Sequence, residues 1–140
     1  MTPKIAILID GGYFLKRLPT VRPQVDASNP ERVCAEIKRL ITSHLRRENK
    51  VVRAAHARHL LYRAFYYDSR PYDKKHHYPI SRRSIDFGKS PQAKFRLELF
   101  DGLRRTANMA LRLGEVRIER GWVLAESAQK GLLKRERTVD

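Results

Sequence analysis

Hydrophobic positions along this chain fall into separate blocks, and two of these blocks have the pattern of buried strands. Apart from Lys4, positions 4–9 (KIAILI) are continuously apolar, and the run ends on Asp10. Continuous hydrophobicity is typical of a strand covered on both faces, as in a parallel sheet between helices. The aromatic-rich segment 59–69 (HLLYRAFYYDS) predicts a second strand that ends at Asp68.

A third strand is predicted at 115–124 (EVRIERGWVL), where Val116 and Ile118 fall on one face. Between the second and third strands, residues 70–84 contain two prolines and no hydrophobic period. This segment is therefore predicted to be a loop.

Helical periodicity fills much of the remaining sequence. The segment GGYFLKRL (11–18) predicts a turn that runs into a short helix, and the helix is expected to end at Pro19. A longer helix is predicted to begin at Pro30, with Ser28 or Asn29 as its cap, and to fade near Arg47.

A further helix is predicted after the loop. Ser90 is its expected cap, Pro91 its first residue and Gly114 its end. Its apolar stripe comprises Phe95, Leu99, Leu103 and Ala107.

The resulting order, β-α-α-β-α-β, implies right-handed crossovers between parallel strands. We therefore expect an α/β fold with a three-layer, Rossmann-like parallel sheet and flanking helices. At 140 residues, the chain is expected to form a single domain over 1–140.

The charge balance points to a polyanionic partner. Lys and Arg number 30 against 15 Asp and Glu, a net charge of +15. Such an excess favours nucleic acid as the partner, although a merely soluble basic protein remains the alternative. No apolar run is long enough to cross a membrane, and no membrane partner is expected. Cys34 is the sole cysteine and is expected to be a buried thiol, in keeping with a reducing, cytoplasmic location.

Two acidic residues are the candidate chemistry. Asp10 and Asp68 end predicted parallel strands, and ligands of such sheets bind at the carboxyl ends of the strands. Carboxylates suit Mg²⁺ or Mn²⁺, and Gly11 and Gly12 leave room for a metal ion or a phosphate beside them. The alternative for Asp10 is a turn or helix-cap carboxylate, and for Asp68 an ordinary turn residue.

Basic and aromatic residues alternate in the predicted loop 70–84. This mixture suits single-stranded nucleic acid, with phosphates on the cations and bases on the rings, although a solvated surface loop is an equal alternative. The candidate nucleic-acid-binding residues are Arg70, Tyr72, Lys74, Lys75, Tyr78, Arg82 and Arg83.

Several of these motifs together resemble the N-terminal portion of an NYN domain, a family of PIN-like metal-dependent nucleases. They are IAILIDGGYFLKRL, RAFYYDSRPYD, FRLELFDGLRRT and GEVRIERGWVL. The resemblance implies a PIN-like fold and RNA phosphodiester hydrolysis, with water activated by Mg²⁺ or Mn²⁺. It also implies that Asp10 is the first metal-binding, catalytic aspartate, and it places Asp68 in a recurrent family motif.

The chain departs from the family pattern in two places. Tyr13 stands where many relatives have Asn, and the family's later acidic motifs (KGVD and SGDSDF types) do not occur up to Asp140. One or two carboxylates are too few to fix a metal ion octahedrally. We therefore expect an incomplete or split nuclease domain whose first strand is left at an exposed, apolar sheet edge.

Three functions remain open at this point. The chain is a ribonuclease whose missing carboxylates come from elsewhere, a non-catalytic nucleic-acid-binding module, or an interaction protein. In the last case a second copy or a partner chain completes the sheet edge.

Overall fold

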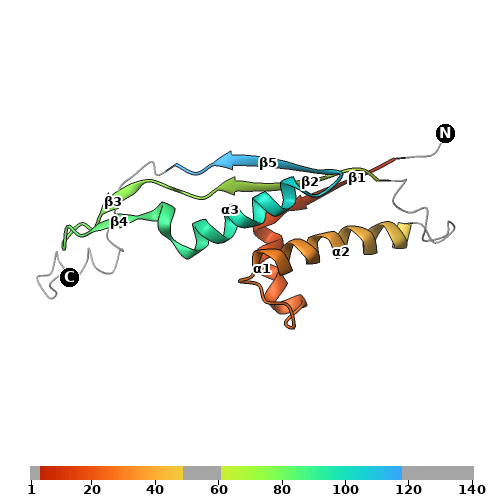
Figure 1. Ribbon diagram of the computed structural model, residues 1–140, viewed down its shortest axis with the longest axis horizontal. Coiled ribbons are helices and arrows are strands. Elements are labelled where there is room, and N and C mark those ends of the chain that lie inside the picture. The colour runs from red at the N-terminus through yellow and green to blue at the C-terminus, as the bar shows by residue number, and fades with distance from the viewer. Residues whose placement is uncertain (1–3, 49–60, 118–140) are drawn as a thin grey trace, which may run out of the picture.

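The computed structural model describes residues 4–48 and 61–117, which form one sheet, a small hairpin and a layer of helices (Figure 1). The elements in chain order are β1 (Ile5–Asp10), α1 (Gly11–Val21), α2 (Pro30–Glu48), β2 (Leu61–Arg70), β3 (Lys75–His77), β4 (Ser84–Asp86), the 3₁₀ helix η2 (Phe87–Lys89), α3 (Pro91–Arg104) and β5 (Met109–Glu115).

The main sheet is parallel, with the strand order β1-β2-β5. Strand order therefore follows chain order, and the described strands contain no reversal point. Right-handed crossovers that proceed in one direction place their helices on one face of the sheet. Figure 1 shows α1, α2 and α3 on the same side of the sheet, so the described residues form two layers rather than the expected three. The α/β class and the parallel sheet with flanking helices are as predicted.

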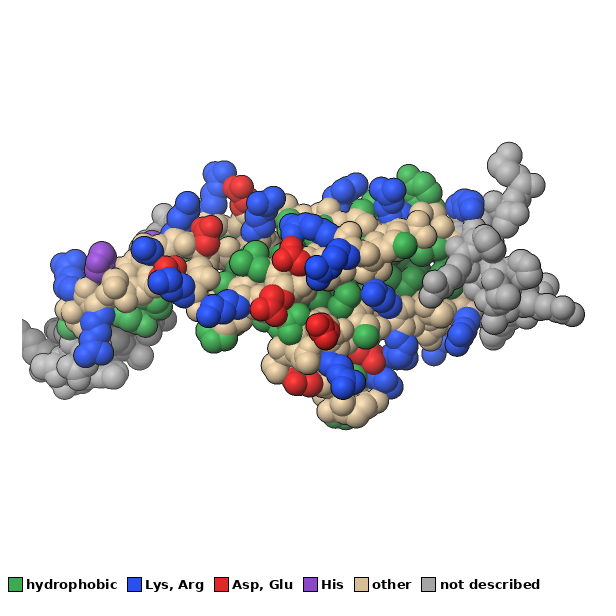
Figure 2. All heavy atoms as spheres, in the orientation of Figure 1, with side chains coloured by type: hydrophobic (Ala, Val, Ile, Leu, Met, Phe, Trp, Pro, Cys, Tyr) green, Lys and Arg blue, Asp and Glu red, His purple; other side chains and the backbone are tan. Residues whose placement is uncertain are grey.

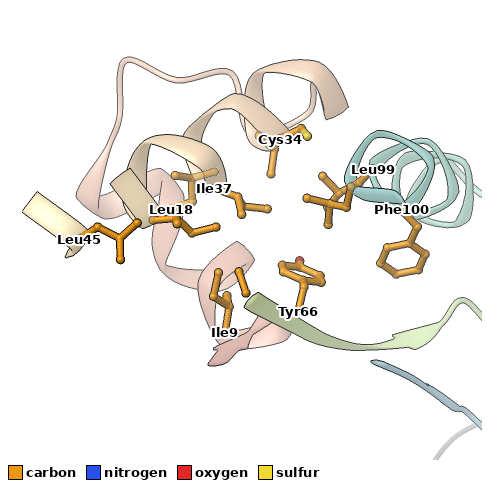
Figure 3. Packing of buried hydrophobic residues seen from close by; sticks show 12 residues of the cluster. Ile9, Leu18, Cys34, Ile37, Leu45, Tyr66, Leu99 and Phe100 are labelled. Atoms are coloured by element: carbon orange, nitrogen blue, oxygen red, sulfur yellow. The ribbon is translucent and has the colours of Figure 1, made fainter. Parts of the chain in front are cut away.

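The core lies between this sheet face and the helices. Ile9 and Tyr66 project from neighbouring strands toward Ile37, Leu99 and Phe100, as Figure 3 shows. Other buried members are Leu18, Val33, Cys34, Ile41, Leu45, Ala64 and Leu103. The buried thiol of Cys34 agrees with the sequence prediction.

The predicted starts of the two longer helices are confirmed. Pro30 begins α2, and the Asn29 side chain accepts hydrogen bonds from the backbone N–H groups of Glu31 (3.0 Å) and Arg32 (3.3 Å). Ser90 caps α3 by accepting the N–H of Ala93 at 3.1 Å.

The predicted end of α1 at Pro19 is wrong, because the helix continues to Val21. Pro19 has no N–H to donate to the carbonyl of Leu15, yet the helix continues for two more residues. The N–H of Arg22 donates to the carbonyl of Leu18 at 2.8 Å and closes the last turn.

The predicted boundary between the last helix and the last strand is also wrong. Helix α3 ends at Arg104, and the residues expected to continue it form β5. Asn108, with φ of 58°, occupies the left-handed region and turns the chain back along β2. Gly114 lies within β5 rather than stopping a helix, and Ile118 lies outside the described residues.

The segment 70–84 is not only a loop. Its residues Lys75–His77 form β3, which pairs in antiparallel fashion with β4. The hairpin is closed by two backbone bonds, from the N–H of Tyr78 to the carbonyl of Arg83 (2.9 Å) and from the N–H of Arg82 to the carbonyl of Tyr78 (3.1 Å). Figure 1 shows this hairpin extending past the carboxyl ends of β2 and β5.

Among the described strands, β1 is an edge strand, as expected. Leu8 in its middle is 64% exposed. An apolar groove of about 480 Å³ runs beside β1, between it and helices α1 and α2. Across the described residues, no helix has the length and apolar character needed to span a membrane.

Candidate active site

Asp10 is the last residue of β1 and the N-cap of α1. Its Oδ1 atom accepts the backbone N–H of Tyr13 at 3.0 Å. This cap is the alternative that the sequence left open for Asp10. One carboxylate oxygen is thereby committed to the helix, and the residue as a whole is exposed.

Asp68 lies two residues before the end of β2, not at its end as predicted. Its Oδ1 atom accepts the backbone N–H of Ser69 at 2.8 Å. Its Oδ2 atom is buried and has no hydrogen-bond partner among the residues that the structure describes. A buried carboxylate oxygen without a partner is costly, so it is a natural ligand atom for a cation or a donor from a bound molecule.

Tyr66 precedes Asp68 by two residues on β2 and is the register partner of Ile9, the residue before Asp10. It is fully buried, and its hydroxyl has no hydrogen-bond partner in residues 4–48 and 61–117. Burial raises the pKa of Tyr66 well above its ordinary value, and the negative charge of Asp68 raises the pKa further. Asp10 acts in the same direction and Arg96 opposes it, so all three charged groups lie within electrostatic reach of this hydroxyl.

Gly11 makes this arrangement possible. A Cβ atom at this position would lie 2.5 Å from Cζ and 2.7 Å from the hydroxyl oxygen of Tyr66. The Tyr66 ring therefore occupies the space that any other residue at position 11 would fill. The neighbouring Gly12 is open, because the nearest atom to its hypothetical Cβ is Oδ1 of Asp10 at 3.6 Å.

A cleft opens beside Asp68, between the end of β2, the base of the hairpin and the start of α3. Its volume is about 750 Å³, and its polar lining includes Ser69, Arg70, Gln92 and Arg96. The first turn of α3 adds the positive end of a helix dipole. A carboxylate thus stands beside cationic and N–H groups, an arrangement that can hold a phosphate next to a metal ion.

The predicted nucleic-acid-binding residues lie on the hairpin arm, which comprises residues 70–89. Lys74, Lys75, Arg82 and Arg83 are exposed, as is Arg70 at the end of β2. Figure 2 shows Lys and Arg side chains over this end of the molecule and along the rest of the visible face. The structure thus places the predicted cations together on one projecting element.

The two aromatic residues of this prediction behave differently. The Tyr72 ring packs against His76 and Phe87, with ring centroids 5.5 and 5.4 Å apart, and its hydroxyl contacts Nε2 of His76. Tyr72 therefore stabilises the hairpin and is not an exposed stacking surface, contrary to the sequence interpretation. Tyr78 is 40% exposed at the turn of the hairpin.

Within residues 4–48 and 61–117, no three His, Cys, Asp or Glu side chains are grouped closely enough to hold a metal ion. Asp10 and Asp68 are thus a pair of carboxylates on neighbouring parallel strands.

Two residues of this site, Tyr66 and Arg96, were missed from the sequence, where Tyr66 is one aromatic residue of a predicted strand and Arg96 is one cation among many on a helix. Gly11 was identified, but the Tyr66 ring fills the space beside it that was expected to hold a metal ion or a phosphate. The only sequence signal was the two-residue spacing of Tyr66 and Asp68, which puts both side chains on one face of a strand.

No protein-family model matches this chain, and the comparisons with curated proteins and solved structures find no match either. The resemblance to the NYN family therefore stays a prediction that rests on the sequence motifs.

Proposed function

We propose that this chain belongs to an NYN-like, metal-dependent RNA hydrolase, in which Asp10 and Asp68 contribute to one Mg²⁺ or Mn²⁺ site. The remaining ligands come from the RNA phosphate and from carboxylates of another segment or a second chain. The hairpin arm holds the RNA backbone. The observation that carries the proposal is the buried Oδ2 of Asp68, which has no hydrogen-bond partner among the described residues and lies beside a basic cleft.

The donor set fits a single hard cation. Mg²⁺ is commonly bound through one or two carboxylates, retains several waters and takes further oxygens from substrate phosphates. Asp68 offers Oδ2 and Asp10 offers the oxygen that does not cap α1. Two such residues do not provide the bridging ligands of a two-metal centre.

When bound, the ion would polarise a phosphodiester and lower the pKa of a coordinated water. The other tasks belong to the protein. Arg96 and Arg70 line the cleft, where their guanidinium groups can hold non-bridging phosphate oxygens in fixed orientation. The exposed cations of the hairpin arm supply the sequence-independent affinity for the backbone.

Substitution of Asp10 by Asn separates its two roles. Asn is as good an N-cap as Asp, so Asp10→Asn should keep the helix start while removing the charge that a cation needs. We expect Asp10→Asn to abolish Mn²⁺-dependent cleavage of a labelled RNA and to leave RNA affinity equal or slightly higher. The cleaved fraction is measured on denaturing gels, and Mn²⁺ binding by paramagnetic resonance of the free ion.

The matched controls are Asp10→Ala and Asp68→Asn. Asp10→Ala loses the cap as well and should cost about 1 kcal/mol of stability. Asp68→Asn should weaken Mn²⁺ binding without affecting that cap. Cleavage by Asp10→Asn at the rate of the original chain would contradict the proposal.

The hairpin arm gives a second prediction. Lys75→Gln together with Arg83→Gln removes two exposed cations that do not support the fold. If both contact phosphates of single-stranded RNA, the slope of log K against log salt should become shallower by about 1.4. Fluorescence anisotropy of a labelled RNA across a salt series measures this slope. An unchanged slope would show that these two residues of the hairpin arm do not contact the RNA.

The second candidate function is a non-catalytic RNA-binding module. It is favoured by the cap that engages Asp10 and by the absence of a third acidic ligand in the described part of the chain. It predicts RNA binding with the same salt dependence but no cleavage with Mn²⁺, either before or after the Asp10→Asn substitution.

A further inference from the structure

The face of the sheet opposite the helices carries a set of aromatic and arginine side chains that the proposed site does not use. Ala64 and Tyr66 of β2 are buried beneath the helices. Because side chains alternate along a strand, Phe65 and Tyr67 between and beyond them project from the other face. We call this other face the outer face.

The outer face is open to solvent in the described structure. Tyr67 is 43% exposed, and Leu8 on the neighbouring β1 is 64% exposed. The pairing of β1 with β2 is irregular after Ile5: Ile5 pairs with Leu61 and Ala6 with Arg63, so Tyr62 has no register partner on β1. Tyr62 is 60% exposed. Aromatic rings therefore follow the central strand of the sheet along its accessible side.

Arginine side chains lie among these rings. The guanidinium carbon of Arg112 lies 5.3 Å from the ring centroid of Phe65, and Arg112 is also the register partner of Tyr67 on β5. The guanidinium carbon of Arg63 lies 6.0 Å from the ring centroid of Tyr62. Both distances are within or at the limit of a cation–π contact.

The mixture of arginine and aromatic side chains favours one of two possible partners for the outer face, single-stranded nucleic acid rather than a layer of helices. A packed layer of helices would bury Arg112, which lies midway along β5, and a buried guanidinium without a carboxylate partner is strongly unfavourable. Single-stranded nucleic acid instead supplies negative phosphates for the arginines and flat bases for the rings. The net charge of +15 favours the same partner.

We propose that the outer face is a stacking platform for single-stranded RNA, with bases on Tyr67 and Phe65 and phosphates on Arg112 and Arg63. This inference shares its RNA ligand with the proposed function but assigns it to different residues. Asp10 is the register partner of Tyr67, so the platform adjoins this carboxylate at one end, and it binds RNA whether or not the chain cleaves it.

The test uses the full chain and a labelled single-stranded RNA of about 12 nucleotides that contains 2-aminopurine. Tyr67→Ala should weaken binding about tenfold and reduce the quenching of 2-aminopurine that stacking produces. Tyr67→Phe keeps the ring and should retain both signals. Arg112→Gln should weaken binding and make the salt dependence shallower.

Arg46→Gln is the matched control, because Arg46 is an exposed arginine in the last turn of α2, on the helix side of the sheet. It should leave binding and quenching close to those of the original chain. Circular dichroism of each variant separates loss of binding from loss of folding, and Tyr67→Phe keeps the test usable if Tyr67→Ala misfolds.

The outcomes distinguish the two proposals. Unchanged affinity and quenching in Tyr67→Ala would overturn the platform, even if the hairpin variants weaken binding and support the proposed function. Loss of quenching in Tyr67→Ala would support the platform, even if Asp10→Asn showed no effect on cleavage. Protection of the outer face from labelling by another segment or chain in free solution would also overturn it.

Discussion

Gly11→Ala is expected to destabilise this protein by about 2–3 kcal/mol, the upper range for overpacking a filled core. The added methyl group would lie 2.5 Å from Cζ of Tyr66, a ring that is itself fully buried. Neither partner can move easily, because Gly11 is fixed by the start of α1 and Tyr66 is held by the ladders of β1 and β5. Urea unfolding followed by circular dichroism measures the loss as a lower midpoint with an unchanged slope.

Gly12→Ala is the matched control for this substitution. Its new Cβ would meet nothing closer than Oδ1 of Asp10 at 3.6 Å, an ordinary contact. Since alanine is the better helix former by up to about 1 kcal/mol, Gly12→Ala should be neutral or slightly stabilising. Equal losses for the two variants would mean that the Tyr66 ring does not occupy the space beside Gly11.

The sequence predicted correctly those helices and strands whose structure depends on residues that are neighbours in the chain. The cap and proline at the starts of α2 and α3, and the continuous apolar run of β1, depend on residues next to each other in the sequence. The two helix starts and the strand β1 are confirmed, but the predicted burial of β1 on both faces is wrong for the described residues, since its burial alternates and Leu8 is 64% exposed.

The last strand was misplaced because its structure depends on a distant partner. The segment MALRLGE (β5) consists mostly of good helix formers, so its local preference continues the preceding helix. Seven register partners on β2 override that preference once the two segments meet. The hairpin of β3 and β4 was missed for a similar reason, since three-residue strands carry no detectable period.

The candidate site was predictable only in its charged members. Asp10 and Asp68 were identified because carboxylates at strand ends are conspicuous in a basic chain. Tyr66 was not identified, and Gly11 was identified for open space beside it rather than for its contact with Tyr66. That contact arises where β2 packs against the first turn of α1. A hydroxyl that is buried without a partner is visible only in three dimensions.

That hydroxyl gives the second large prediction, Tyr66→Phe. The substitution removes a buried polar atom without a protein partner and leaves the ring in place. We expect the free energy of unfolding at neutral pH to rise by about 1–3 kcal/mol, the cost of an unsatisfied polar group. Thermal or urea unfolding measures the gain, and a loss of stability would show that this hydroxyl is satisfied in solution.

The pH dependence of the same variant provides an independent check. The folded state keeps Tyr66 protonated because burial and the charge of Asp68 raise its pKa, whereas the unfolded chain releases this proton above about pH 10. Below about pH 10 both states keep this proton, so the free energy of unfolding does not depend on it. Above that pH the unfolded chain loses the proton while the folded protein keeps it, and the free energy of unfolding falls by about 1.4 kcal/mol per pH unit. Tyr66→Phe should remove this part of the fall in the free energy of unfolding above pH 10. If the two proteins lost stability in parallel above pH 10, the Tyr66 hydroxyl would not be the buried group that titrates, and its burial near the charge of Asp68 would have no energetic consequence.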